Sequence, residues 1–219
     1  MIRSHSLSMG KAPKIGVIGL SVAIQAGGES TRMGADKALL PFQGGTMIEH
    51  ILRQVEGLGD EIFIITNRPE NYRRFGLPTF MDVIPNWGAL GGLYSALYHS
   101  PQEYCLILAC DMPFINRPLL EHIISLSPEY DAVVPRLSPR FIEPFRAVYR
   151  KTCLPPIEAV IDAGQRRVIS FFDQVNIRFV ERAEIEQLDP ECRSFFNVNT
   201  IEDLAKAGEM ATGIFRVRA

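Results

Sequence analysis

The chain has 219 residues, of which 47% are hydrophobic and 22% charged, values typical of one globular domain and unlike those of a disordered or fibrous protein. Its formal net charge of -2 provides no broad positive field, which excludes nucleic acid as an expected partner. No apolar run reaches the ~20 residues that span a bilayer, so no membrane association is expected.

The chain begins with residues 1–14, whose Ser, His and Lys content and lack of periodicity predict a flexible leader before a single domain at residues 15–219. Residues 15–24 follow Lys11 and Lys14 and superficially resemble a secretory signal. A glycine-rich loop follows them where a cleavage site would be expected, so we predict a cytoplasmic protein. The four cysteines form no C-x-x-C pair, which favours reduced, buried thiols.

Strand-like and helix-like segments alternate through the first two thirds of the chain. Residues 15–25 read as a buried strand, and residues 61–66 as a second one. Between them Thr46 and Glu49 form a capping box that opens a helix reaching about residue 58. A helical turn near residues 70–75, a brief strand ending at residue 82 and a helix at residues 90–99 follow.

The alternation continues to about residue 135, and the last third of the chain is less regular. Residues 104–109 are continuously apolar, as expected for a central strand buried on both faces, and Asn116 is a good N-cap for the next helix. Further strands are predicted at residues 131–135, 145–149, 177–180 and 195–199. Helices are predicted after a break at Pro155 and Pro156, at residues 167–172, and from Thr200. The pattern predicts an α/β fold: a three-layer, Rossmann-like sandwich around a mostly parallel sheet.

The loop after the first strand combines two glycines with two cations. Gly27 and Gly28 let the backbone approach a phosphate, and Arg32 and Lys37 add positive charge. Ligands bind beyond the carboxyl ends of parallel strands, where this loop leaves the sheet. Its spacing fits neither a Walker loop nor a dinucleotide-binding turn. These features predict a triphosphate site, against the alternative of an ordinary surface loop.

Asp111 follows the central strand and therefore faces the same edge of the sheet. Magnesium in nucleotide enzymes is commonly held by one or two carboxylates plus substrate phosphates, so Asp111 is a candidate ligand for Mg2+. The alternative is an Asx turn before Pro113. Asn67 and Asp82 also end strands, where they could recognise a purine or ribose, or simply form turns.

Residues 27–40, GGESTRMGADKALL, resemble the phosphate loop of the molybdenum cofactor guanylyltransferases, which share the nucleotide-diphospho-sugar transferase fold. Five shorter similarities follow in chain order: TNR at 66–68, GALG at 88–91, CDMP at 110–113, GQRRV at 164–168 and FNVNT at 196–200. The resemblance therefore spans nearly everything after the leader. Departures are visible at Gln25, Ala89 and Glu143, where the family commonly has leucine, proline, and histidine or glutamine.

The resemblance implies a nucleotidyltransferase that transfers GMP from GTP to molybdopterin, forming the guanine dinucleotide cofactor and pyrophosphate. It implies catalytic roles for Arg32, Lys37 and Asp111, with Asp111 as the Mg2+ ligand. The nucleotide site that it implies consists of Gln25, Ala26, Gly27, Gly28, Lys37, Asn67, Asp82 and Asp111. Acceptor binding is implied for Arg166, Arg167, Asn197 and Asn199. Proteins that insert the cofactor, or that chaperone molybdoenzymes, are implied as further partners.

Alternatives remain open for several of these residues. Arg166 and Arg167 could be a solvated helix end, and Asn197 and Asn199 could simply lead into the helix at Thr200. A cytidylyltransferase acting on molybdopterin or another phosphorylated acceptor would share the fold and similar loops. A non-catalytic nucleotide-binding or cofactor-delivery module is the alternative outside enzymes. The charge of Glu143 makes the acceptor less certain than the nucleotide transfer.

Overall fold

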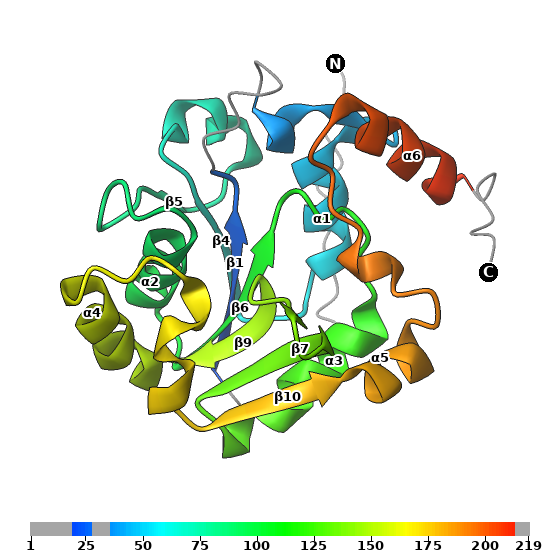
Figure 1. Cartoon of the computed structure of the whole chain (residues 1–219). Coiled ribbons are helices and arrows are strands. Elements are labelled where there is room, and N and C mark those ends of the chain that lie inside the picture. The colour runs from blue at the N-terminus through cyan, green and yellow to red at the C-terminus, as the bar shows by residue number, and fades with distance from the viewer. Residues whose placement is uncertain (1–18, 28–35, 213–219) are drawn as a thin grey trace.

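The computed structural model describes residues 19–27 and 36–212, and these form a three-layer α/β sandwich (Figure 1). The predicted leader, Gly28 and Arg32 lie outside the described residues. Within the described part, an eight-stranded sheet has the order β10-β7-β9-β6-β1-β4-β5, and β8 pairs with β7. Its strands are β1 (Leu20–Gln25), β4 (Glu61–Ile65), β5 (Thr79–Phe80), β6 (Tyr104–Ala109), β7 (Ala132–Ser138), β8 (Phe141–Ile142), β9 (Arg146–Arg150) and β10 (Ile177–Glu181).

The sheet is mostly parallel, as predicted, with one strand inverted near its centre. β1 pairs in parallel with β4 and β6, β4 with β5, and β7 with β10. β9 lies between β6 and β7 and runs antiparallel to both. The carboxyl ends of β1, β4, β6 and β7 therefore share one edge, whereas β9 starts there. β2 (Pro41–Phe42) and β3 (Gly45–Thr46) form a separate hairpin.

Helices cover both faces of the sheet. Successive side chains of a strand point to opposite faces, and in the central strands the side chains on both faces are apolar. On one face Val22 and Leu106 belong to a cluster that includes residues of α1 (Met47–Val55), α3 (Arg117–Leu126) and α5 (Arg182–Leu188). On the other face Ala23 and Ile107 pack with residues of α2 (Gly88–His99) and α4 (Leu154–Asp162). Burial on both faces explains the continuously apolar sequence of the central strands. The sequence prediction of an α/β sandwich is confirmed.

Local capping signals place several helices where the sequence predicted them. Thr46 and Glu49 form the predicted capping box, and Glu49 accepts the Thr46 N–H at 2.7 Å. Asn116 caps α3 by accepting the Leu119 N–H at 2.9 Å. Thr200 caps α6 (Ile201–Ala211) and forms a capping box with Asp203. None of the described helices is both long and apolar enough to cross a bilayer.

Two expectations for the last third of the chain were wrong. Pro155 and Pro156 do not break a helix; they occupy the first turn of α4, where no intrahelical N–H donor is required. The predicted strand at residues 195–199 is absent from the described sheet. It is replaced by the end of the 3-10 helix η7 (Arg193–Phe195) and an extended connection, because Val198 donates its N–H to Asp111 and not to a neighbouring strand.

The remaining 3-10 helices are connectors. They are η1 (Lys37–Leu39), η2 (Pro69–Asn71), η3 (Arg73–Phe75), η4 (Ser127–Glu129), η5 (Lys151–Cys153) and η6 (Val168–Gln174). η2 and η3 account for the helical turn predicted near residues 70–75, and η6 for the helix predicted at 167–172. α5 was missed by the sequence analysis, although Glu181 and Glu184 give it a capping box.

Candidate active site

Three strand ends meet at one edge of the sheet and position the candidate site. Gln25, the last residue of β1, is in register with Ile65 of β4 and Ala109 of β6. The chain continues the pairing one step further, because Ala26 donates to the Ile65 carbonyl at 2.9 Å and Cys110 to the Gln25 carbonyl at 3.0 Å. The segments that follow these strands therefore leave the sheet side by side, as the parallel topology predicts.

Lys37, Asp111 and Asn199 come together at this edge from three distant parts of the chain. Lys37 begins η1, and its Nζ donates to Asn199 Oδ1 at 3.0 Å. Asp111 is joined to the same connection, because its carbonyl accepts the Val198 N–H at 2.8 Å. The Lys37 charge acts on the Asp111 carboxyl. Lys37 and Asp111 therefore lie close enough at this edge of the sheet for their charges to interact.

The surroundings of Asp111 offset only part of the cost of burying its carboxyl group. Its Oδ1 is buried and lacks a hydrogen-bond partner among the described residues. Burial raises the pKa of Asp111 above its ordinary value of 3.8, and the charges of Lys37 and Arg146 oppose that increase. A buried carboxylate oxygen without a donor suits a cation better than it suits an Asx turn.

A tyrosine hydroxyl contacts the residues that precede and follow the glycine loop. The buried Tyr72 hydroxyl lies 3.2 Å from the Ala26 carbonyl and 2.7 Å from Asp36 Oδ2. The other oxygen of Asp36 accepts the Ala38 N–H and caps η1, which carries Lys37. Tyr72 therefore ties the exit of β1 to the turn that presents the cation. The sequence analysis missed this residue, since a lone tyrosine in a helical turn carries no local signal.

Two predicted nucleotide residues bind each other. Asn67 donates its side-chain amide to Asp82 Oδ2 at 2.7 Å and accepts the Asp82 N–H at 3.1 Å. The pair links the segments that follow β4 and β5. Gly27 lies beside it, since a Cβ at Gly27 would be 3.6 Å from Cα of Thr66. Ala26 is buried, and its N–H and carbonyl are already bonded to Ile65 and Tyr72.

The side chain of Gln25 packs against α2, the helix that covers this part of the sheet. A Cβ added to Gly92 would lie 2.8 Å from its Nε2, so Gly92 is needed for this close contact. Nε2 is buried and has no partner among the described residues. The structure thus places Gln25 at the edge through its backbone and directs its side chain toward α2.

The predicted acceptor residues lie in two separate places. Arg166 donates to the Asn86 carbonyl at 2.8 Å and its guanidinium lies 4.9 Å from the centre of the Trp87 ring. Arg167 is exposed at the start of η6, and Asn197 is exposed in the connection to α6. No contact among the described residues joins the two arginines to Asn199. Figure 1 accordingly places α4 and α6, which adjoin these two segments, on opposite sides of the molecule.

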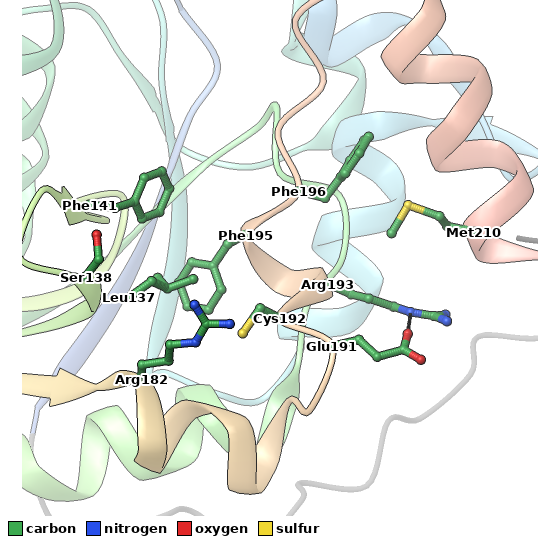
Figure 2. A pocket seen from close by; sticks show the side chains of 10 residues that line it. All are labelled: Leu137, Ser138, Phe141, Arg182, Glu191, Cys192, Arg193, Phe195, Phe196 and Met210. Carbon is green, nitrogen blue, oxygen red and sulfur yellow. Dashed lines mark hydrogen bonds and ion pairs between the residues drawn. The ribbon is translucent and has the colours of Figure 1, made fainter. Parts of the chain in front are cut away.

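A hollow of about 490 Å3 lies beside the connection that carries Asn197 and Asn199 (Figure 2). Its walls come from β7 and β8, from η7 and from α6, with Phe141, Phe195 and Met210 among them. Arg193 at its rim is ion-paired with Glu191, and Arg182 with Glu186. None of the predicted site residues lines this hollow, so it is distinct from the edge of the sheet where Lys37 and Asp111 lie.

Comparison with known proteins agrees with this geometry. Residues 22–177 match the model of the MobA-like NTP transferase domain. The chain belongs to this family. A relative from Clostridium perfringens, named probable molybdenum cofactor guanylyltransferase, is 36% identical over 196 residues, covering 87% of this chain and 98% of that protein.

Two solved structures place the fold within the same group. Molybdopterin-guanine dinucleotide biosynthesis protein A from Archaeoglobus fulgidus superposes with a TM-score of 0.76 at 25% identity, covering 88% of this chain and 99% of the other. Rv0371c from Mycobacterium tuberculosis, solved as a complex with manganese, has a TM-score of 0.56 at 16% identity, covering 87% and 98%. The second likeness shows the fold alone.

Proposed function

We propose that the chain transfers GMP from GTP to molybdopterin, releasing pyrophosphate and forming the guanine dinucleotide cofactor. Membership of the NTP transferase family and a relative named as a molybdenum cofactor guanylyltransferase support this activity. The observation that carries the site assignment is the meeting of Lys37 and Asp111 beyond the ends of β1 and β6.

In the proposed reaction a phosphate oxygen of the acceptor attacks the α-phosphorus of GTP. A new P–O bond forms as the bond to the β-phosphate oxygen breaks, and pyrophosphate leaves with its electron pair. Such transfers require mainly positioning and charge neutralisation. Lys37 supplies a fixed positive charge at the site, and we propose that Arg32 and the backbone N–H groups around Gly27 and Gly28 supply the rest.

Asp111 is the residue that we propose holds a divalent cation, Mg2+ in particular. The fit is supported by its buried Oδ1 without a donor, and this one carboxylate would share the ion with substrate phosphates. A bound cation would neutralise charge on the triphosphate during transfer.

No covalent enzyme intermediate is required by this scheme. The thiols of Cys105, Cys110 and Cys153 are buried, and burial raises their pKa, so none of them supplies a thiolate nucleophile at neutral pH. Free, unpaired cysteines are also typical of a reducing compartment, which supports our placement of the protein in the cytoplasm.

We propose that Asn67 and Asp82 recognise the guanine and ribose. Their mutual hydrogen bonds orient an amide and a carboxylate at the end of the sheet, and both side chains can present their remaining donor and acceptor positions to a nucleotide. Gln25 and Ala26 would then line the nucleotide site, with their carbonyls held by Cys110 and Tyr72. Residues 15–219 act as one nucleotidyltransferase domain in this proposal.

For the acceptor, we propose that Asn197 and Asn199 approach it from the α6 side and Arg166 and Arg167 from the α4 side. Asn199 is placed next to Lys37, where an attacking phosphate would be neutralised. Arg166 is held against Trp87, which limits its mobility and leaves its charge exposed. Cofactor-insertion proteins and molybdoenzyme chaperones would be the proteins that receive the product.

The proposal is tested by incubating the protein with Mg2+, molybdopterin and either GTP or CTP, and by measuring pyrophosphate release and product mass. We expect the guanine dinucleotide from GTP and a much lower rate from CTP. Preference for CTP would identify a cytidylyltransferase. Stabilisation by nucleotide without any pyrophosphate would identify a binding or delivery module, and either result would contradict the proposal.

A further inference from the structure

Arg146 is a fully buried charged side chain beneath the site, and the proposed chemistry does not use it. It is the first residue of β9 and is 0% exposed. The register pairs it with Leu108 of β6, three residues before Asp111. The inverted strand therefore brings a guanidinium directly under the turn that carries the proposed metal ligand.

One contact joins Arg146 to that turn. Its Nη2 donates to the Met112 carbonyl at 3.0 Å, one residue after Asp111. The opposite side of the turn is held by Val198, whose N–H binds the Asp111 carbonyl at 2.8 Å. The backbone on both sides of the Asp111 side chain is thus fixed, by a buried cation on one side and by the connection leading to Asn199 on the other.

The charge of Arg146 has three acidic neighbours. Burial lowers the pKa of Arg146 to about 10 against the opposing charges of Glu143, Asp189 and Asp111, and the guanidinium is charged at neutral pH. Glu143 is itself 9% exposed, and its Oε1 accepts the Phe145 N–H at 3.0 Å. Asp189 anchors η7 by accepting the Ser194 N–H at 2.9 Å. The charge of Arg146 therefore interacts both with the turn that carries Asp111 and with the residue that anchors η7.

The hydrogen bonding of this group is incomplete. Nε and Nη1 of Arg146 are buried without partners among the described residues, as is Oδ1 of Asp111. Leaving buried donors and a buried acceptor unpaired is costly, and it is retained mainly where a site has a function. A guanidinium that only stabilised the core would be expected to donate hydrogen bonds from all of its nitrogen atoms.

We propose that Arg146 is a positioning residue for divalent-cation binding: it fixes the turn 110–113 through Met112 and offsets the buried negative charge, so that Asp111 is presented to the ion. This inference depends on the metal role proposed for Asp111. Arg146 itself touches neither the nucleotide nor the metal. Groups that orient a metal ligand in this way typically change affinity or activity about 10- to 100-fold when they are replaced.

The test measures Mn2+ binding to the protein–GTP complex without acceptor, by electron paramagnetic resonance, in wild type and in R146Q, R146K and D111N. We expect R146Q to weaken Mn2+ binding by about 10-fold or more, with R146K between R146Q and wild type because it keeps a buried cation. D111N should bind most weakly. R150Q is the matched control, since Arg150 ends the same strand and pairs with Glu103 at 2.8 Å, away from the site.

A kinetic measurement separates positioning from a general structural defect. In R146Q the Mg2+ concentration for half-maximal rate should rise, while the KM for GTP at saturating Mg2+ stays within about twofold of wild type. Thermal melting reports whether each variant is folded. If R146Q fails to fold, R146K alone is compared with wild type, and weaker Mn2+ binding is still expected.

Unchanged Mn2+ binding in folded R146Q, or in R146K when only that variant folds, would overturn the inference, and so would unchanged binding in D111N. Equal losses in R146Q and R150Q would also overturn it. The proposed transfer activity is judged separately, by pyrophosphate release in wild type. Failure of that activity with the predicted Mn2+ order intact would leave the role of Arg146 standing.

Discussion

The nucleotide side and the acceptor side of the proposed site are held in different ways. On the nucleotide side, the ends of β1, β4 and β6 are locked by parallel register, and Tyr72 ties Ala26 to Asp36. On the acceptor side, Arg166, Arg167 and Asn197 are exposed on connections that contact different elements. The nucleotide side is thus preorganised by the sheet, whereas the acceptor side depends on loops, which carry specificity more readily than scaffold residues.

The largest effect should come from D111N, which replaces the proposed metal-binding carboxylate without changing its size. If the nucleotide side is preorganised around this group, we expect pyrophosphate release to fall about 1000-fold, because an amide is a poor Mg2+ ligand. D162N, at the exposed end of α4, is the control. Turnover within tenfold of wild type in D111N would remove Asp111 from the mechanism.

K37M should have the next largest effect. It removes the cation that the structure places beside Asp111 and Asn199, and we expect kcat to fall about 100-fold, since a preorganised charge at a transferring phosphoryl group contributes at this level. Lys206, exposed on α6, supplies the control variant K206M. A K37M enzyme with a raised KM and an unchanged kcat would mean that Lys37 binds the substrate and the transition state equally and does not lower the barrier of the chemical step.

Y72F probes whether the nucleotide side is held together in the way that the hydrogen bonds indicate. The substitution keeps the buried ring and removes the hydroxyl that joins Ala26 to Asp36, so we expect about a tenfold loss in kcat/KM for GTP. Y98F is the control, because Tyr98 is 54% exposed. Equal kinetics for Y72F and Y98F would show that the sheet alone holds the loop ends.

The smallest effect, and the one that separates the two sides, is expected from R166A. We expect a rise of about three- to tenfold in the KM for molybdopterin, because an exposed charge contributes modestly, and no change in GTP binding measured by calorimetry. R150A controls for the loss of a surface arginine. A loss of GTP affinity in R166A would place this arginine on the nucleotide side and contradict the separation of the two sides.

The same contrast explains what the sequence could and could not predict. Thr46 with Glu49, and Asn116 before Pro118, are local signals with one physical reading, and both helices begin where they indicate. The carboxyl ends of parallel strands must share an edge, so the pattern of strands is enough to place Asp111 near the glycine loop. The cations of the glycine loop pointed to Lys37 and the resemblance to Asn199, but neither predicted the hydrogen bond that joins these two side chains.

The missed features depend on contacts between distant residues. Tyr72 reaches Asp36 across 36 residues, and Arg146 reaches Met112 across 34, so no window of sequence contains either pair. Residues 196–199 have an extended, partly apolar sequence that suits a strand, yet Val198 bonds to Asp111. Tertiary contacts decided the outcome in each case.

Isotope labelling of GTP tests the central claim most directly, because it shows which phosphorus becomes attached to the acceptor. With Mg2+ and molybdopterin, label at the α-phosphate should appear in the dinucleotide product and label at the γ-phosphate in pyrophosphate, with both signals lost in D111N. Transfer of the γ-label to the acceptor, or an unchanged product yield in D111N, would contradict nucleotidyl transfer at the proposed site of Lys37 and Asp111.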